Sequence, residues 1–329
     1  MVAHATQPTA TFSGARPINL SRDLVSIANL IDRAFADDMD DSGRAAVREM
    51  RLLGRLAFLF SWAESFVPQG EGWAPGFVWI EEGDVVANAT VRRLSLFGRG
   101  WMIGNVAVVP KLRGRGIARS LMNACIDLAR QRNGDWIALQ VRSNNAIARG
   151  LYSSLNFQTI SETIELIRTE PDRVTPPDQS SDGHLRIAEP RDTDKIFALA
   201  QAANTESMRW IEPQYRTQFE LGFDRRLANF LSGTFATWRV IEVDKDIVGA
   251  SSIKVNRWTG ASRLGLWVTP AYRGRVEQTL VDAVLSELPA STRSISARIV
   301  GDHTAGRDAL LSRSFTIVRA LTNMRLDLH

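Results

Sequence analysis

The stretch VVPKLRGRGIARSL, residues 108–121, joins an apolar run to a helical pattern through a turn rich in glycine and arginine. Asn105–Val109 is apolar and β-branched and predicts a buried strand, while apolar residues recur at helical spacing from Ile117 onward. Gly114 and Gly116 therefore lie in a tight strand-to-helix turn, where the lack of a Cβ lets a ligand approach the backbone. Because the first amides of a helix have no intrahelical acceptor, such a turn suits a phosphate.

An ordinary solvated turn also fits this composition, because glycine and other loop residues are common there. Two well-known phosphate loops do not fit. A dinucleotide fingerprint G-x-G-x-x-G needs glycine or alanine where Arg119 stands, and a P-loop needs G-K-[ST], which this stretch lacks. A phosphate bound here would need another kind of loop.

The residues that follow the helix form an ordered pattern of further elements. Trp136–Arg142 predicts a second buried strand, and the SNN at residues 143–145 supplies good helix N-caps. A short helix through Ala148 and Tyr152 follows, and Leu155–Phe157 leads into another strand. This order of strand, turn, long helix, strand, asparagine and tyrosine is more specific than any one of its parts.

These features together resemble the Gcn5-related N-acetyltransferase (GNAT) superfamily over about residues 105–157. The family's pyrophosphate loop Q/R-x-x-G-x-G/A matches the segment from Arg113 to Ala118, and its N-x6-Y pair matches Asn145 and Tyr152. Its L-Y-x-x-L-G-F segment departs only at Asn156, a residue that also tolerates left-handed dihedrals. The resemblance implies a mixed α/β (α+β) fold and acetyl-CoA as co-substrate.

The resemblance also implies which residues contact the coenzyme. A splayed strand at residues 106–108 would bind the pantetheine arm, and the glycine turn would bind the pyrophosphate. The implied coenzyme contacts are Val106, Ala107, Val108, Arg113, Gly114, Arg115, Gly116, Ile117, Ala118, Arg119, Asn145 and Tyr152. No metal is implied, and the four histidines show no metal-ligand spacing.

The reaction implied by the resemblance is direct attack of a neutral amine on the thioester of acyl-coenzyme A. Backbone amides of residues 106–108 are the candidates that polarise the carbonyl. Tyr152 is the candidate catalytic residue, giving the departing thiolate a proton or a hydrogen bond. The alternative for Tyr152 is a core tyrosine on an apolar helix face, and the alternative for Asn145 is a plain N-cap.

A general base for the incoming ammonium is missing from the expected position. Gln140 stands where relatives often carry glutamate, and an amide cannot take up the proton. Three functions therefore stay open. The first is an N-acetyltransferase acting on a primary amine of a small molecule or peptide, and the second is a non-catalytic acyl-coenzyme A-binding protein. The third, aminoacyl transfer from tRNA, requires a continuous basic groove.

An acidic segment between the first two predicted helices is the candidate acceptor-binding loop. Its carboxylates would attract a cationic amine and could supply the missing base: Asp37, Asp38, Asp40 and Asp41. In the family this segment commonly borders the acceptor pocket. The alternative is a solvated loop whose aspartates, with Ser42, cap the second helix.

The second half of the chain repeats the organisation of the first. LWVTPAYRGRVEQTL at residues 266–280 echoes AVVPKLRGRGIARSL, and Arg273 follows Arg113 by 160 residues (273 − 113). A segment with three prolines, residues 169–183, reads as a linker. We therefore predict a flexible tail at 1–15, a coenzyme-binding GNAT domain at 16–169, a linker at 170–183 and a degenerate GNAT-like domain at 184–329.

The second copy of the turn differs from the first at two positions. Val276 stands where the first copy has Gly116, and Glu277 stands where it has Ile117. A Cβ hinders the close approach of a pyrophosphate, and a carboxylate repels it. We therefore expect the second domain to bind no coenzyme, to support the fold and to wall the acceptor pocket. His303 falls near the position that corresponds to Asn145.

Each domain is predicted to be a mixed sheet with a central parallel strand pair. In the first, a strand at 16–20, helices at 21–35 and 45–60 and a hairpin of strands at 77–82 and 85–96 precede the strand at 101–109. In the second, helices at 191–203 and 214–231 precede strands at 237–243, 247–255 and 261–268.

Composition and charge are those of a soluble enzyme. The chain has 329 residues, 44% hydrophobic and 23% charged, and no apolar run long enough to cross a bilayer. The net charge of +4 comes with only four lysines and with scattered arginines, which argues against nucleic acid as a partner. The single cysteine, Cys125, is predicted as a small core residue, and a cytoplasmic location follows as the default.

Overall fold

The chain folds into two compact units whose segments interleave in the sequence. In this computed structural model, residues 12–34, 47–48, 51–52, 76–94, 98–169, 174–177, 182–204, 209, 214–257, 261–289 and 292–329 are described. The first unit comprises residues 1–140, 153–157 and 325–329, and the second comprises residues 141–152 and 158–324.

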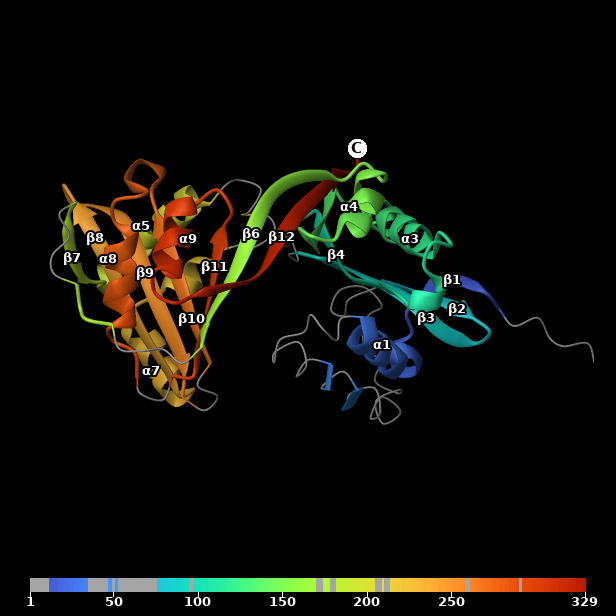
Figure 1. The fold of residues 1–329 in the computed structure, drawn as a ribbon, viewed down its shortest axis with the longest axis horizontal. Helices are drawn as coiled ribbons and strands as arrows, with labels where there is room; N and C mark the ends of the chain where they lie inside the picture. The colour runs from blue at the N-terminus through green and yellow to red at the C-terminus, as the bar shows by residue number, and fades with distance from the viewer. Residues whose placement is uncertain are drawn as a thin grey trace, which may run out of the picture. The chain divides into compact units, whose positions relative to one another are not determined.

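The first unit is a sheet with helices packed on its two faces (Figure 1). Its strands lie in the order β1 (Gly14–Pro17), β2 (Gly76–Glu81), β3 (Asp84–Arg93), β4 (Gly100–Val108) and β5 (Trp136–Arg142). The first four pair antiparallel, and β5 joins β4 in parallel. Helices α1 (Leu20–Ala34) and α3 (Ile117–Gln131) both contact β3 from opposite sides, so three consecutive strand residues, 87–89, are buried.

Helix α3 begins at the predicted residue and buries one side against this sheet. Its buried residues recur at helical spacing: Ile117, Leu121, Met122, Cys125, Ile126 and Ala129. Cys125 is fully buried, and burial raises the pKa of its thiol to about 12, so the thiol stays protonated at neutral pH. The prediction that Cys125 is a core residue is confirmed.

The second unit repeats this architecture on a longer sheet. Its strands lie in the order β12 (Thr316–Asp327), β6 (Gln158–Thr169), β11 (Ser294–Val300), β10 (Ala261–Val268), β9 (Asp246–Asn256), β8 (Thr234–Val243) and β7 (His184–Ile187). Its helices include α5 (Thr193–Ala203), α7 (Phe223–Leu231), α8 (Glu277–Leu285) and α9 (Thr304–Leu311). Strands β10 and β11 are parallel, as β4 and β5 are in the first unit, which confirms the predicted central parallel pairs.

The compact units do not divide at the proline-rich segment, because strand pairing is non-local. Strand β6 precedes that segment, yet it pairs antiparallel with β11 from Thr169 opposite Ser294 to Thr163 opposite Val300. Conversely, the last residues of the chain belong to the first unit, where the Leu328 amide donates to the Asp135 carbonyl at 2.9 Å. The predicted domain limits therefore describe the two repeats of the sequence and not the two compact units. Strand β1 begins at Gly14, which lies inside the tail predicted at 1–15.

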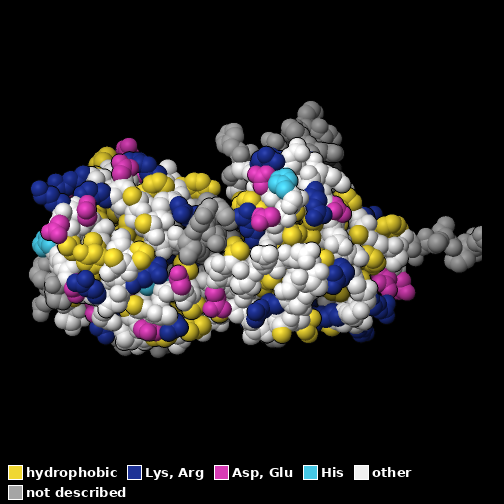
Figure 2. All heavy atoms as spheres, turned by 90° about the horizontal axis from the view of Figure 1, so that it is seen from above, with side chains coloured by type: hydrophobic (Ala, Val, Ile, Leu, Met, Phe, Trp, Pro, Cys, Tyr) yellow, Lys and Arg dark blue, Asp and Glu magenta, His cyan; other side chains and the backbone are white. Residues whose placement is uncertain are grey.

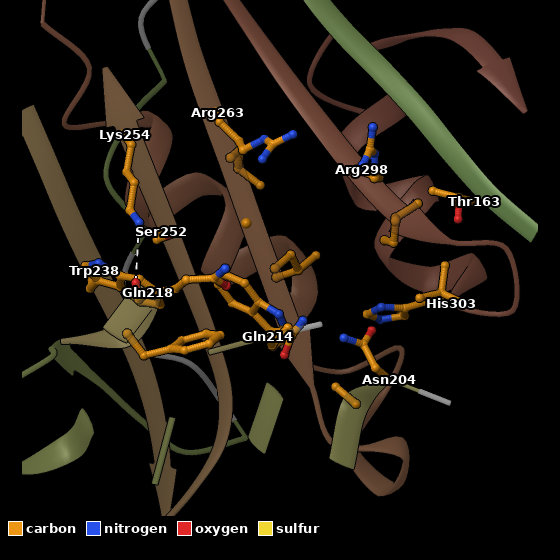
Figure 3. A pocket seen from close by; sticks show the side chains of 18 residues that line it. Thr163, Asn204, Gln214, Gln218, Trp238, Ser252, Lys254, Arg263, Arg298 and His303 are labelled. Atoms are coloured by element: carbon orange, nitrogen blue, oxygen red, sulfur yellow. Dashed lines mark hydrogen bonds between the residues drawn. The ribbon is translucent and has the colours of Figure 1, made fainter. Parts of the chain in front are cut away.

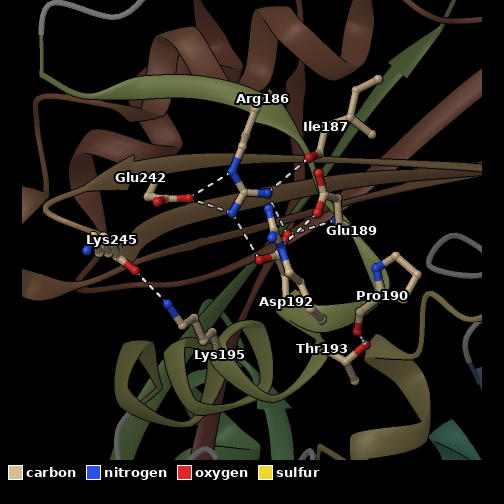
Figure 4. A network of polar contacts seen from close by, with 10 residues as sticks. Arg186, Ile187, Glu189, Pro190, Asp192, Thr193, Lys195, Glu242 and Lys245 are labelled. Atoms are coloured by element: carbon tan, nitrogen blue, oxygen red, sulfur yellow. Dashed lines mark hydrogen bonds and ion pairs between the residues drawn. The ribbon is translucent and has the colours of Figure 1, made fainter.

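The start of each half contains the same buried ion pair, which supports the internal repeat. Arg16 of β1 contacts Asp23 of α1 through two hydrogen bonds of 2.6 and 2.7 Å. Arg186 of β7 contacts Asp192 in the same way, at 2.6 and 3.0 Å, and also binds Glu242 (Figure 4). Each aspartate also accepts a backbone amide of its own turn at 2.8 Å. The two halves therefore share a local structure that tethers the first strand to the following helix.

One predicted helix differs from the structure, and another lies mostly outside the described residues. The helix predicted at 214–231 is two pieces, a 3₁₀ turn at Arg216–Phe219 and α7, separated by extended backbone up to Gly222. The break allows Phe219, 1% exposed, to pack against Trp238 and Trp267. Of the helix predicted at 45–60, only residues 47–48 and 51–52 lie within the described residues, and they are helical.

Candidate functional site

The corner between β4 and α3 is an open turn. The chain passes through a 3₁₀ turn, η2 (Pro110–Leu112), and then through Gly114 and Gly116, whose φ angles are 82° and 78°. Apart from the adjoining residues, no atom of the described residues lies within 4 Å of where a Cβ would stand at either glycine. Within the described part of the chain, neither glycine amide donates to an acceptor. Two exposed glycines at a helix start thus have amides without a partner among the described residues and open space at their Cβ positions, features that suit an anion.

Three arginines surround this turn, and each is held by a neighbour. The Nε of Arg113 donates to the Val108 carbonyl at 3.2 Å, and Arg115 forms an ion pair with Glu81 at 3.3 Å. Arg119 donates to the Ser154 hydroxyl at 2.7 Å. All three side chains are exposed, so their charge is available to a ligand in solution.

Strand β4 is irregular where it approaches the turn. Its parallel pairing with β5 runs from Gly100 opposite Trp136 to Ile103 opposite Leu139. A bulge follows at Asn105, whose φ is 51°. The backbone carbonyl of Asn105 accepts a hydrogen bond of 2.8 Å from the side-chain amide of the buried Asn88. The predicted splay of the central parallel strands thus begins after Ile103.

The amides at the end of β4 alternate in direction. The Val109 amide donates to the Val86 carbonyl of the β3 side at 2.9 Å, so Ala107 also faces β3 while Val106 and Val108 face away. The bond from Arg113 to the Val108 carbonyl agrees with this direction. The amides of Val106 and Val108 are therefore directed to the side on which β5 has diverged.

Tyr152 lies on helix α4 (Ala146–Ser153), and Asn145 is the residue directly before this helix. The Asn145 side-chain oxygen accepts the Ala148 amide at 3.0 Å, so Asn145 is the N-cap of this helix. Tyr152 is 7% exposed, and burial raises its pKa to about 12. Residues 141–152 belong to the second unit and the glycine turn belongs to the first, so their meeting in one site stays a prediction. Asn156, after this helix, has a φ of 66°, as its place in the L-Y-x-x-L-G-F match predicted.

The proposed acceptor residues Asp37, Asp38, Asp40 and Asp41 lie outside the described residues. Gln140 is half-buried on β5. Among the described residues there is no cluster of three or more His, Cys, Asp or Glu side chains that could hold a metal ion. Likewise, no described helix is both long and apolar enough to cross a membrane.

The corresponding corner of the second unit is filled by its own side chain. Gly274 keeps a left-handed φ of 84°, but Val276 has a φ of −118° and is fully buried at the start of α8. The Glu277 carboxylate turns back and accepts the Gly274 amide at 2.8 Å and the Val276 amide at 3.2 Å. His303, the residue before α9, lies 2.8 Å from the same carboxylate through its Nε2.

The sequence predicted that the Glu277 carboxylate would repel a pyrophosphate. In the structure this carboxylate also occupies the backbone amides of the turn. Glu277 is 2% exposed and occupies the position of an anion in the turn. Burial opposes its ionisation, but hydrogen bonds from His303 and from the Gly274 amide outweigh burial and lower its pKa. The partner His303 was not predicted. A glutamate in R-G-R-V-E, where the first copy has isoleucine, is the sequence signal that could have found it.

The surface carries both signs of charge. On the face shown in Figure 2, Lys and Arg side chains are interspersed with Asp and Glu. A continuous basic groove is not seen among the described residues on that face.

The comparisons with known proteins give a family likeness for part of the first half of the chain. Residues 47–157 match the model of the acetyltransferase (GNAT) family. This region is similar to the GNAT family. The match includes β4, the glycine turn, α3 and α4. Comparison with curated protein sequences gave no match.

Solved structures extend the likeness in fold to the whole chain. A GCN5-related N-acetyltransferase from Sphaerobacter thermophilus is 16% identical with a TM-score of 0.62, over 96% of this chain and 95% of that one. A tandem GNAT protein from the clavulanic acid biosynthesis pathway is 15% identical with a TM-score of 0.55, over 96% and 98%. A putative acetyltransferase from Pyrococcus horikoshii is 16% identical with a TM-score of 0.51, over 99% and 93%. The chain therefore has a tandem GNAT fold.

Proposed function

We propose that the GNAT domain transfers an acetyl group from acetyl-CoA to a primary amine of a small molecule or peptide. The observation that carries the proposal is the open glycine turn at the start of α3. It offers the Gly114 and Gly116 amides, space where a side chain would otherwise stand, and three exposed arginines. These are the groups that a pyrophosphate needs, and a Cβ at either glycine would fill the space.

The end of β4 supports the acyl-transfer step. The amides of Val106 and Val108 face away from β3 and would donate to the thioester oxygen as negative charge develops on it. The amine nitrogen attacks the thioester carbon, a C–N bond forms, and the C–S bond breaks. Tyr152, protonated because its pKa is near 12, would donate its hydroxyl hydrogen to the departing sulfur and regain a proton from the nitrogen of the new amide.

The proton of the incoming ammonium needs a separate acceptor. Gln140 cannot serve, because an amide is not a base at neutral pH. We assign this role to the acidic segment of Asp37, Asp38, Asp40 and Asp41, which would also attract the amine. In the second domain, Glu277 takes the position that a pyrophosphate would need, so we propose one coenzyme per chain.

An assay of thiol release tests the proposal. The full chain is incubated with acetyl-CoA and a panel of primary amines, and free coenzyme A is measured with a thiol reagent. Release that depends on an amine, with formation of the N-acetyl product, supports the transferase. Tight binding of acetyl-CoA without turnover on any amine would instead favour the non-catalytic acyl-coenzyme A-binding protein.

Tyr152→Phe tests the role of the phenol. We expect kcat to fall about 100-fold while the Kd for acetyl-CoA changes little, because the hydroxyl acts mainly on the departing sulfur. In the parent protein, Tyr152 should not ionise between pH 7 and 10, so it contributes no loss of rate in that range. An unchanged kcat for Tyr152→Phe would mean that the tyrosine is only a core residue.

A further inference from the structure

A cavity of about 520 Å³ lies in the second unit, where strands β10 and β11 part (Figure 3). The parallel pairing of these strands ends with Leu264 opposite Ala297. The residues that follow on both strands, 265–267 and 298–300, line the cavity. Its volume lies in the range of sites for small molecules.

Three cations from neighbouring strands line this cavity: Lys254 of β9, Arg263 of β10 and Arg298 of β11. Arg298 forms an ion pair with Glu165. Lys254 and Arg263 are direct cross-strand partners, a like-charged pair that destabilises a sheet. Neither of them forms an ion pair within the described part of the chain, and no Asp or Glu is among the described residues that line the cavity. An anion would relieve this unbalanced charge.

Stacked aromatic rings lie beside the cations. Trp238 and Trp267 stack with ring centroids 5.4 Å apart and planes 11° from parallel, and both line the cavity. Phe219 packs against the two indoles at 5.8 and 5.4 Å. The Lys254 Nζ lies 5.8 Å from the Trp238 ring centre. A flat apolar wall next to an ammonium suits a ring that carries a negative group.

A hydroxyl group lies beside this wall. The Ser252 side chain is 4% exposed and lines the cavity. Gln214 also lines the cavity, but its Oε1 atom is buried and does not face a ligand there.

The turn at the start of α8 does not offer coenzyme A the open amides that the turn at the start of α3 offers. The pyrophosphate position is taken by the Glu277 carboxylate, which also holds His303 at the edge of the cavity. Residues 273–277 of the turn are not among the residues that line the cavity.

We propose that this cavity binds a small aromatic carboxylate. Its carboxylate lies on Lys254 and Arg263, and its ring packs on the wall that contains Trp267. This binding function goes beyond the proposed acetyl transfer and does not depend on it.

Calorimetry on the full chain tests the site with three probes: indole-3-acetate, indole-3-acetamide and inorganic phosphate. We expect one indole-3-acetate per chain, with the amide, which has the same shape without the charge, bound about tenfold more weakly. Lys254→Gln should weaken indole-3-acetate about tenfold. The matched control is Lys245→Gln, an exposed lysine of the turn between β8 and β9, which should leave the affinity unchanged.

Several results would overturn the proposal. These are no saturable binding of indole-3-acetate at millimolar concentration, equal affinity for the acid and the amide, or equal affinity of Lys254→Gln and the parent. Phosphate that competes as well as the acid would reduce the cavity to a site for any anion. In Gly116→Val, indole-3-acetate binding should persist while acetyl-CoA binding is lost, so failure of one proposal is distinguishable from failure of the other.

Discussion

The two glycine turns of this chain begin alike and end in opposite states. Gly114 and Gly274 have nearly the same left-handed φ, 82° and 84°, and neither has an atom within 4 Å of a Cβ position. Two residues later the backbones diverge, with φ of 78° at Gly116 and −118° at Val276. One turn leaves its amides open, and the other gives them to Glu277.

This difference shows how an anion-binding turn can be closed with little change of fold. A β-branched valine does not adopt the left-handed φ of Gly116, so the backbone rotates. The following residue then directs a carboxylate at the amides that a phosphate would use. The internal carboxylate is always present at high effective concentration, so an external anion competes poorly.

The largest expected effect comes from making the first turn like the second. Gly116→Val should weaken acetyl-CoA at least about 100-fold, because the residue is forced from φ 78° and its side chain fills the space of the pyrophosphate. The fold should survive, since apart from the adjoining residues no atom of the described part of the chain is within 4 Å of the new Cβ. Calorimetry measures the affinity, and circular dichroism checks the fold.

The same titration counts the sites in the parent protein. One acetyl-CoA per chain is expected, since Glu277 closes the second turn. Unchanged affinity in a folded Gly116→Val protein would remove the coenzyme site from this turn. Two tight sites per chain would contradict the closed state of the second turn.

A smaller effect is expected from removing the charge that closes the second turn. Glu277→Gln should lower the free energy of unfolding by about 2 kcal/mol at pH 7, because His303 and two amides lose a charged acceptor. The Glu277 pKa is lower in the folded protein than its usual 4.5, so its stabilisation is complete above pH 4.5 and is lost as the pH falls through the folded pKa.

Urea denaturation of the parent and of Glu277→Gln at several pH values measures this contribution. The difference between the two proteins should narrow in acid. A difference that stays constant from pH 7 down to the acid range would show that the charge of Glu277 does not stabilise the turn.

Much of the fold could be predicted because its signals are local. The start of α3 at Ile117 follows from a glycine turn before a helical pattern, and the strand Trp136–Arg142 has the predicted bounds. The pairing of β6 with β11 could not be predicted, because a strand's own residues do not specify its partner. The break before Gly222 depends on the contacts of Phe219 with two tryptophans far along the chain.

The candidate site divides in the same way. The spacing in the sequence predicted the glycines and arginines of the first turn. The repeat also showed that Glu277 stands in the second turn. The direction of the Glu277 side chain was not legible, since it depends on His303 of a separate helix. The cavity beside β10 was missed, because its cations and aromatic residues come from elements that are distant in sequence.

The smallest expected effect concerns the ion pair that the two halves share. Asp23→Asn should destabilise the first unit by about 1.5 kcal/mol, since Arg16 has no second carboxylate partner among the described residues. Asp192→Asn should cost only about 0.5 kcal/mol, because Glu242 still pairs with Arg186. The hydrogen bond from Arg186 lowers the pKa of Asp192, so its share is present above pH 3.8 and is lost as the pH falls further. Urea denaturation of both variants at pH 7 measures the two costs, and a larger loss for Asp192→Asn would mean that Glu242 does not take over the pair.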